Sequence, residues 1–112
     1  MSKPLFSVVC PTYNSAEFIG DTLKSVVEQT YAADEIVVVD DGSTDNTVQI
    51  ILAIKEISAV RIRLIESKHA GPGAARNLGI KATVNQWIAF IDSDDFWRSE
   101  KLAMVAVYIE KN

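Results

Sequence analysis

Four short apolar runs alternate with segments of helical periodicity along the 112 residues, and this alternation constrains the fold more than any other feature. Runs of about four to eight residues that are rich in β-branched and aromatic side chains are typical of buried strands. Strands that alternate with helices form parallel sheets with right-handed crossovers. The sequence therefore predicts one α/β domain, with an open, mainly parallel β-sheet of four strands in the order 3-2-1-4, flanked by helices. The expected strands are residues 5–10, 35–40, 61–66 and 87–91.

Helices are expected between these strands, because apolar residues recur there every three or four positions. Ser15 and Ser99 are candidate N-caps of the first and last helices, and Thr44 or Asp45 is a candidate cap of the second. The helices are expected at residues 16–30, from 44 or 45 onward, at 74–82 and from 100 onward. The expected apolar faces consist of Phe18, Ile19, Leu23, Val26 and Val27 in the first helix and of Val48, Ile51 and Leu52 in the second.

The composition fits a globular domain and excludes several classes of protein. Hydrophobic residues make up 48% of the chain and charged residues 23%, as in folded domains and unlike disordered chains. The formal net charge of −4 provides no basic surface, so no nucleic-acid partner is expected. No apolar stretch approaches the roughly 18–20 residues of a membrane-spanning helix, and the N-terminus lacks a signal-peptide layout.

The single cysteine, Cys10, excludes an internal disulfide framework and fits a reducing compartment. Because it ends an apolar run, we expect it to pack in the core. We therefore expect a cytoplasmic location, with peripheral association of a longer parent protein at the inner face of the membrane as a further option.

The end of the chain carries more apolar surface than a lone domain can cover. Residues 102–109 leave almost no polar face, and such a helix is expected to contact protein on every side. The strand at 87–91 would form an open edge although it is as apolar as an interior strand. We interpret the chain as the front half of a larger enzyme. A homodimer that pairs through the exposed fourth strand is the alternative.

Aspartates directly follow two of the apolar strands. Asp40 and Asp41 end one strand, and Asp92, Asp94 and Asp95 follow another. Ligands of open α/β sheets bind outside the carboxyl ends of the strands, so these carboxylates are expected to share a site. Because concentrated negative charge repels itself, we expect aspartates from both segments to hold one divalent cation beneath a pyrophosphate, next to a nucleotide. Solvated turns and helix caps are the competing interpretation.

Two further segments are expected at the same edge. Pro11-Thr12-Tyr13-Asn14 closes the first strand, and Tyr13 could lie against a nucleobase, although a structural turn explains the segment equally well. The glycines of Gly71-Pro72-Gly73 allow close backbone approach or unusual dihedral angles. Arg76 falls early in a helix, where a cation opposes the helix dipole, so a role toward a base or diphosphate explains it better. Lys68-His69 is interpreted as surface loop.

The four motifs P-T-Y-N, V-V-D-D-G-S-T-D, G-P-G-A-A-R-N and F-I-D-S-D-D occur in this order. Together they resemble the nucleotide-binding half of inverting family 2 glycosyltransferases with the Rossmann-like GT-A fold, and the resemblance extends over residues 5–108. It implies transfer of a sugar from a nucleotide-diphospho-sugar, expected to be UDP-linked, to a saccharide or lipid-linked acceptor in glycan biosynthesis. It also implies that residues 1–112 are the donor-binding part of such a domain, truncated before the acceptor-binding half.

The resemblance also implies roles for individual residues and a divalent cofactor. Asp41 would contact the base and Asp92 the ribose side of the nucleotide. Asp94 would hold Mg²⁺ or Mn²⁺, and the metal would bridge the two phosphates. The nucleotide-binding residues implied by the resemblance are Pro11, Tyr13, Asp41, Arg76, Asp92 and Ser93.

The implied mechanism is a direct displacement at the anomeric carbon, in which a carboxylate deprotonates the acceptor hydroxyl. In the family this base lies in the acceptor-binding half, so it is expected beyond Asn112. No catalytic base is therefore assigned within the chain, and Asp95 is only a weak candidate. The expected consequence is a donor-binding fragment with little or no transferase activity of its own.

Other functions fit the motifs less well. A dinucleotide-binding oxidoreductase needs G-x-G-x-x-G after the first strand, and residues 10–15 contain no glycine. A sugar nucleotidyltransferase would carry a glycine-rich basic loop there, and a phosphoacceptor receiver domain would place its acids differently. A non-catalytic module that binds a nucleotide or mediates assembly is the alternative from another class.

Overall fold

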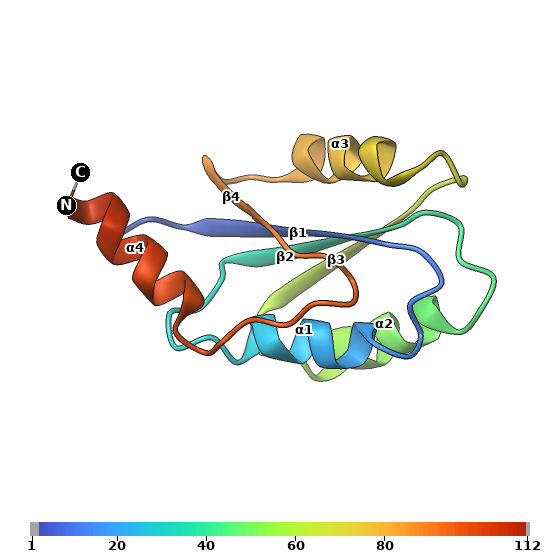
Figure 1. Cartoon of the computed structure of the whole chain (residues 1–112), viewed down its shortest axis with the longest axis horizontal. Helices are drawn as coiled ribbons and strands as arrows, with labels where there is room; N and C mark the ends of the chain where they lie inside the picture. Colours follow the sequence, from blue (N-terminus) through green and yellow to red (C-terminus); the bar gives the residue numbers. More distant parts are fainter. Residues whose placement is uncertain (1–2, 112) are drawn as a thin grey trace.

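The computed structural model describes residues 3–111, in which four strands and four helices alternate (Figure 1). The strands are β1 (Phe6–Thr12), β2 (Glu35–Asp40), β3 (Arg61–Glu66) and β4 (Trp87–Phe90). The helices are α1 (Ile19–Val27), α2 (Thr47–Ile57), α3 (Pro72–Ala82) and α4 (Lys101–Lys111). The predicted α/β class is therefore confirmed. Each of the helices in this part of the chain is too short or too polar to span a membrane.

Asn112, beyond which the catalytic base is expected, lies outside the described residues. The structure therefore does not test where that base is, and its position stays a prediction.

The four strands are parallel and form one sheet in the predicted order β3-β2-β1-β4. β1 lies inside the sheet, where Val8 is paired with Ile36 of β2 on one side and with Ala89 of β4 on the other. Parallel pairing brings the carboxyl ends of neighbouring strands to the same edge. The loops that follow β1, β2 and β4 therefore leave the sheet side by side.

Successive strand residues point to opposite faces of the sheet, and each face has its own core. Val8 and Val38 belong to the larger core, to which α1, α2 and α4 contribute. Val37 and Val39 point the other way and pack with Ala75 of α3. Figure 1 shows α3 alone above the sheet and α1 and α2 below it.

Cys10 and Glu35 are ionisable side chains that are buried within the sheet. Cys10 is fully buried, as predicted, and burial raises the pKa of its thiol to about 12. Glu35, at the amino end of β2, accepts hydrogen bonds from the Ser7 hydroxyl at 2.6 Å, the Val84 amide at 2.9 Å and Nε of Arg63 at 3.0 Å. Burial alone would raise the pKa of Glu35, but these bonds outweigh it and lower the pKa.

The starts of the first and last helices differ from the prediction. α1 begins at Ile19, because the amides of Phe18 and Ile19 donate to the backbone carbonyl of Ser15 and not to its hydroxyl. Phe18, predicted on the buried face, lies before the helix and is exposed. The hydroxyl of Ser99 donates to the neighbouring carboxylate of Glu100, so the predicted cap of α4 is wrong.

The apolar face of α2 is rotated from the predicted one. α2 begins at Thr47 with Asn46 at the N-cap position, so the predicted caps Thr44 and Asp45 are wrong. The carboxylate of Asp45, one residue before the cap, accepts hydrogen bonds from the amide and the hydroxyl of Thr47. Ile51 is buried as predicted. Ile54 packs on the same core, whereas Leu52, predicted to be buried, points outward and is exposed.

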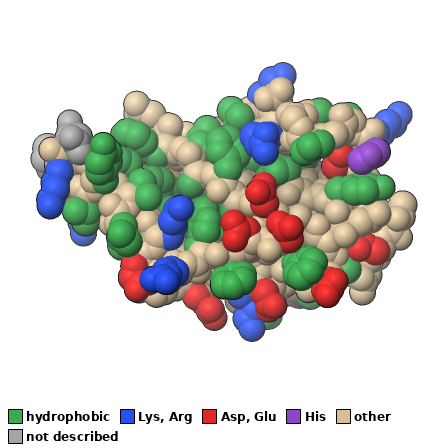
Figure 2. Space-filling view, viewed as in Figure 1, with side chains coloured by type: hydrophobic (Ala, Val, Ile, Leu, Met, Phe, Trp, Pro, Cys, Tyr) green, Lys and Arg blue, Asp and Glu red, His purple; other side chains and the backbone are tan. Residues whose placement is uncertain are grey.

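β4 forms an edge of the sheet and is less buried than its composition suggests. Trp87 and Phe90 are exposed, because β4 pairs with β1 on one side only. α4 buries Leu102 but leaves Met104 and Val107 at the surface. Hydrophobic side chains are accordingly visible over the end of the molecule that carries α4 (Figure 2).

α3 approaches the sheet so closely that one helix position has no room for a side chain. A Cβ atom on Gly79 would lie 2.4 Å from a methyl carbon of Val9 and 3.3 Å from one of Val39. Both valines are fully buried in adjacent strands. Gly79 therefore sets the distance between α3 and the sheet.

We predict that Gly79→Ala lowers the free energy of unfolding by about 1–3 kcal/mol, because α3 must move away from Val9. The matched control is Gly73→Ala on the same helix, where an added Cβ meets nothing within 4 Å. This control should be neutral or stabilising, since alanine favours helix. Urea denaturation measures both variants, and equal effects would contradict the prediction.

Candidate functional site

A cavity of about 260 Å³ opens at the carboxyl ends of β1, β2 and β4. The loops after these strands, the loop between β3 and α3, and the start of α3 form its wall. The structure brings together in this wall all six residues that the motifs nominate for nucleotide binding. The cavity is lined by Pro11, Thr12, Tyr13, Asp41, His69, Pro72, Ala75, Arg76, Asp92 and Ser93.

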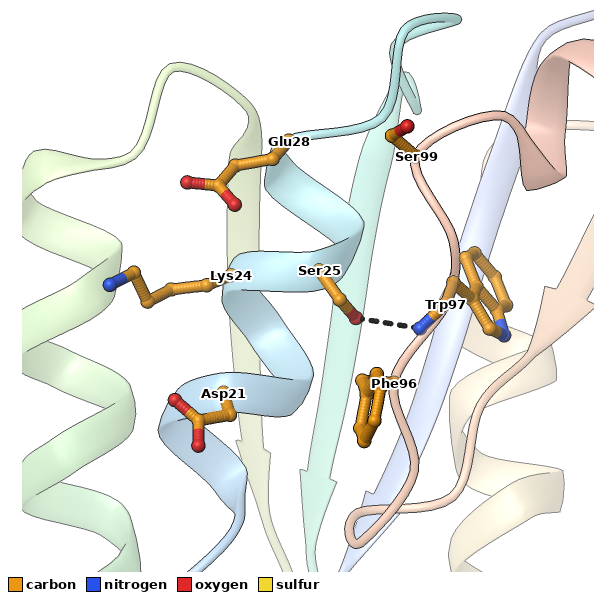
Figure 3. Close-up of a pocket in the computed structure, with 7 residues that line it drawn as sticks. All are labelled: Asp21, Lys24, Ser25, Glu28, Phe96, Trp97 and Ser99. Atoms are coloured by element: carbon orange, nitrogen blue, oxygen red, sulfur yellow. Dashed lines mark hydrogen bonds between the residues drawn. The ribbon is translucent and has the colours of Figure 1, made fainter.

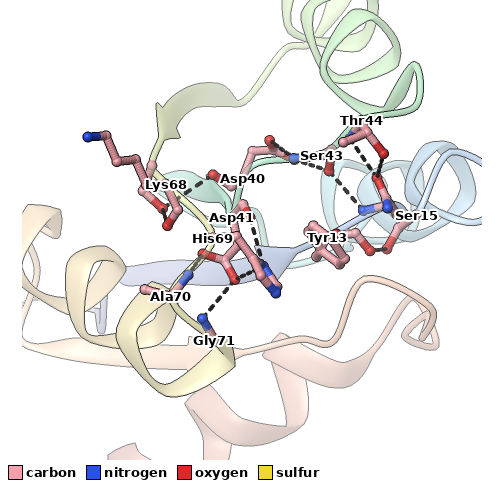
Figure 4. Close-up of polar contacts among 12 residues, drawn as sticks. Tyr13, Ser15, Asp40, Asp41, Ser43, Thr44, Lys68, His69, Ala70 and Gly71 are labelled. Atoms are coloured by element: carbon pink, nitrogen blue, oxygen red, sulfur yellow. Dashed lines mark hydrogen bonds and ion pairs between the residues drawn. The ribbon is translucent and has the colours of Figure 1, made fainter.

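The carboxylate of Asp41 is buried and is held by the loop that leads into α3 (Figure 4). Its Oδ1 accepts a hydrogen bond from the Ala70 amide at 2.9 Å, and its Oδ2 accepts one from the Gly71 amide at 3.0 Å. Nδ1 of His69 lies 3.0 Å from the same Oδ2. The Ala70 hydrogen bond, followed by those of Gly71 and His69, outweighs burial and lowers the pKa of Asp41. Gly71 has a φ of +102°, which glycine adopts without strain.

Asn14 connects the loop after β1 to the loop after β2. Its side-chain oxygen accepts a hydrogen bond from the Thr44 amide at 2.7 Å, and its own amide donates to the Ser43 hydroxyl at 2.8 Å. Its φ of +47° lies in the left-handed region, which asparagine tolerates better than most residues. Asp40 accepts hydrogen bonds from the amide and hydroxyl of Ser43. This network holds the neighbouring Tyr13 at the cavity.

The acidic loop after β4 is anchored from α1. The buried hydroxyl of Thr22 lies within hydrogen-bond distance of the backbone carbonyls of Ser93, at 2.9 Å, and Asp95, at 2.5 Å. The hydroxyls of Ser15 and Ser93 are hydrogen-bonded at 2.7 Å. These contacts fix the loop backbone, while the side chains of Asp92, Asp94 and Asp95 are exposed.

Arg76 lies early in α3 and lines the cavity. Its guanidinium carbon is 5.7 Å from the centre of the Phe90 ring, close enough for a cation–π contact. This contact links the start of α3 to the end of β4 and keeps a positive charge beside the cavity.

His69 is an exposed residue of the loop between β3 and α3, as predicted, and it also belongs to the cavity wall. Its imidazole stacks on the ring of Tyr13, with centroids 4.3 Å apart and ring planes at 28°, and it also contacts Asp41. The sequence carried only a weak signal for this role, because a histidine just before a glycine-rich segment is equally compatible with a solvated loop. The contact arises only when that loop folds back over β1 and β2.

The structure does not gather the aspartates around one cation position. Within residues 3–111, no group of three or more His, Cys, Asp or Glu side chains could hold a metal ion. The expectation that aspartates from both segments hold one cation beneath a pyrophosphate stays a prediction. Asp41 is already engaged by the amides of the α3 loop, whereas Asp94 does not line the cavity.

One hydroxyl in the cavity wall has no hydrogen-bond partner in the described part of the chain. It is Oγ1 of Thr12, which is buried at the end of β1. Leaving such a group unpaired costs roughly 1–3 kcal/mol. An unpaired buried hydroxyl is the kind of exception that is found at functional sites.

A second cleft, of about 380 Å³, lies along α1 (Figure 3). It separates α1 from the segment between the acidic loop and α4, and the Trp97 amide donates to the Ser25 hydroxyl across it at 3.1 Å. None of the nominated site residues lines this cleft. Its walls consist of Asp21, Lys24, Ser25, Glu28, Phe96, Trp97 and Ser99.

The sequence from residue 7 to residue 112 matches the family model of glycosyl transferase family 2. The chain belongs to this family. It is 41% identical over 113 residues to the UDP-Glc:α-D-GlcNAc-diphosphoundecaprenol β-1,3-glucosyltransferase WfgD of Escherichia coli, a match that covers 100% of this chain and 44% of that protein. The chain thus spans less than half the length of this family 2 relative.

Solved structures agree with the family assignment. The complex of residues 1–349 of Staphylococcus aureus TarS with UDP-GlcNAc has a TM-score of 0.84 and 37% identity, over 96% of this chain and 31% of that TarS fragment. The mannosyltransferase PcManGT of Pyrobaculum calidifontis, in complex with GDP-Man and Mn²⁺, has a TM-score of 0.85 and 30% identity, over 92% of this chain and 31% of that protein. The predicted GT-A fold is confirmed.

We predict that Asp41→Asn destabilises this family 2 domain at neutral pH, because the α3 loop loses a charged acceptor. The pKa of Asp41 is lower in the folded protein than its ordinary value of 3.8. Its stabilising contribution is therefore complete above that value and is lost as the pH falls through the folded pKa. Urea denaturation from pH 7 to below pH 4 should show the difference between wild type and variant shrinking in acid. A difference that is independent of pH would contradict this prediction, and the exposed Glu56→Gln serves as control.

Proposed function

We propose that this chain is the donor-binding part of a glycosyltransferase that transfers a sugar from a nucleotide-diphospho-sugar to a saccharide or lipid-linked acceptor in glycan biosynthesis. The observation that carries the proposal is the cavity at the carboxyl ends of β1, β2 and β4, which six independently nominated residues line together. Ligands of open α/β sheets bind at this edge. The names of WfgD and of the TarS complex both include a UDP-linked sugar, which supports a UDP-linked donor.

In this proposal the base of the donor lies between Tyr13, Pro11 and the start of α3. Asp41 accepts a hydrogen bond from a base N–H, because Oδ1 bonds a single amide and a carboxylate oxygen can accept more than one donor. Arg76 supplies positive charge at the same end of the cavity. Asp92 accepts hydrogen bonds from the ribose hydroxyls, and Ser93 lies next to it in the wall.

We propose that Asp94, with Mg²⁺ or Mn²⁺, completes the site when the donor is bound. The carboxylates of Asp92 and Asp94 are exposed, and oxygen ligands of this kind suit hard divalent cations. Because the described residues form no closed set of metal ligands, phosphate oxygens and water would supply most of the coordination. When bound, the metal would offset the negative charge that grows on the leaving nucleoside diphosphate.

The acceptor base is proposed to lie beyond Asn112, in the acceptor-binding part of a longer protein. Within the chain, Asp95 is exposed, and its carboxylate accepts a hydrogen bond from the amide of Phe96 at 2.9 Å. Asp95 does not line the cavity. We therefore assign Asp95 no catalytic role and propose that a carboxylate of the acceptor-binding part deprotonates the acceptor hydroxyl.

We predict that the chain binds UDP and that Mn²⁺ strengthens this binding. Asp94→Ala should abolish the effect of Mn²⁺ and leave the metal-free affinity within about twofold, because the metal links Asp94 to the diphosphate and not to the base. Isothermal titration of UDP with and without Mn²⁺ measures both quantities. Glu100→Ala, another exposed carboxylate near the acidic loop, is the matched control.

A non-catalytic nucleotide-binding or assembly module is the alternative, favoured by the apolar surface over β4 and α4. Binding of UDP that is indifferent to Mn²⁺ would support a module without metal-dependent chemistry. No binding of UDP at all would contradict the proposed function.

We also propose that two copies of the chain pair through the open edge of β4, in a cytoplasmic setting that the buried, reduced Cys10 allows. Trp87 lies on this strand and is 42% exposed. Size-exclusion chromatography with light scattering should show a dimer, and Trp87→Lys should shift it toward monomer, since edge lysines oppose strand pairing. A wild-type protein that is monomeric at all concentrations would contradict this prediction.

A further inference from the structure

We propose that His69 is a positioning residue of the base-binding end of the cavity, where one imidazole holds both Tyr13 and Asp41 in the arrangement that the donor base requires. This inference rests on the proposed function. None of the four sequence motifs includes His69, and only the fold brings it to the cavity.

The first observation is the stacking of the two rings. Tyr13 follows directly after β1 and is 43% exposed, so its side chain is free to rotate unless something packs on it. The imidazole of His69 lies nearly parallel to it, 4.3 Å away. Stacked aromatic pairs at this separation are stabilising. His69 therefore covers one face of Tyr13. In this proposal the planar base stacks on the other face.

The second observation is the contact of Nδ1 with Asp41. Nδ1 lies 3.0 Å from the carboxylate Oδ2 and 3.2 Å from the backbone carbonyl oxygen of Asp41. Both atoms are acceptors, so Nδ1 must carry a proton in order to contact them. The hydrogen bond at one ring nitrogen selects the tautomer, so neutral His69 is protonated at Nδ1 and not at Nε2.

These two contacts act on the two side chains proposed to hold the base. Oδ2 of Asp41 accepts hydrogen bonds from both His69 Nδ1–H and the Gly71 amide. Oδ1 accepts only one, from the Ala70 amide. Asp41 is thus oriented with Oδ1 available to a base N–H. Since the same imidazole braces Tyr13, stacking and hydrogen bonding to the base are coupled through one residue.

Three substitutions separate the two contacts. His69→Phe keeps a flat ring on Tyr13 and removes the N–H donor. His69→Asn keeps an N–H donor close to the position of Nδ1 and removes the ring, and His69→Ala removes both. Lys68→Ala is the control, because Lys68 is a residue of the same loop that does not line the cavity.

The measurement is the affinity for UDP and for inorganic pyrophosphate, each with Mn²⁺, by isothermal titration. His69→Ala should weaken UDP binding about tenfold and each of the other two variants about threefold, as expected for the loss of a ring stack and a hydrogen bond. Pyrophosphate has no base, so its affinity should stay within about twofold of wild type in every variant. If His69→Ala fails to fold in a urea titration, His69→Phe and His69→Asn decide the outcome.

The outcomes separate this inference from the proposed function. If wild type does not bind UDP, the proposed function fails and this inference with it. If wild type binds UDP and the His69 variants bind it equally well or more tightly, only the role of His69 is overturned. A parallel loss of pyrophosphate binding would show a merely structural role and would also overturn it. Nitrogen NMR of the imidazole at about pH 8 should show the proton on Nδ1, and a proton on Nε2 would overturn the assignment.

Discussion

The interaction on which the site depends most is the engagement of the Asp41 carboxylate by the loop that begins α3. Asp41 donates its own amide to the carbonyl of Thr12, which extends the pairing of β1 and β2 by one step. Its side-chain carboxylate accepts hydrogen bonds from the amides of Ala70 and Gly71. One residue therefore joins two strand ends to a helix start. A buried carboxylate without such donors would lower the stability of the fold. The hydrogen bonds from Ala70 and Gly71 therefore hold the start of α3, which carries Arg76, next to the end of β2.

In contrast to the buried carboxylate of Asp41, the carboxylates of the acidic loop are exposed to solvent, and hydrogen bonds hold only the loop itself. Thr22 and Ser15 hold the loop through carbonyl and hydroxyl groups and leave the aspartate side chains out of these contacts. The cost of bringing the carboxylates near one another is small while they are in water. In the proposed function, a cation and a diphosphate would bind this loop without breaking an ion pair first.

The sequence predicted the class, the strand order and the segments that meet at the cavity, because these follow from patterns within each segment. The continuous apolar run at residues 36–39 indicates a strand that is buried on both faces, and it is readable without any partner. Features that depend on a second segment were missed. Phe18 was placed on the buried face because the turn made by the Ser15 carbonyl is not visible in the sequence. Likewise, His69 acquires its role only from Tyr13 and Asp41, which lie far from it along the chain.

β3 contributes no side chain to the cavity, although it belongs to the same sheet. The turn at residues 58–60, which leads into β3, lies at the amino ends of the strands and is closed locally by Ser58 and Val60. Changes of length in this turn would be absorbed at the end of the molecule remote from the cavity. A label or an inserted peptide could therefore be attached at this turn without changing the residues of the cavity.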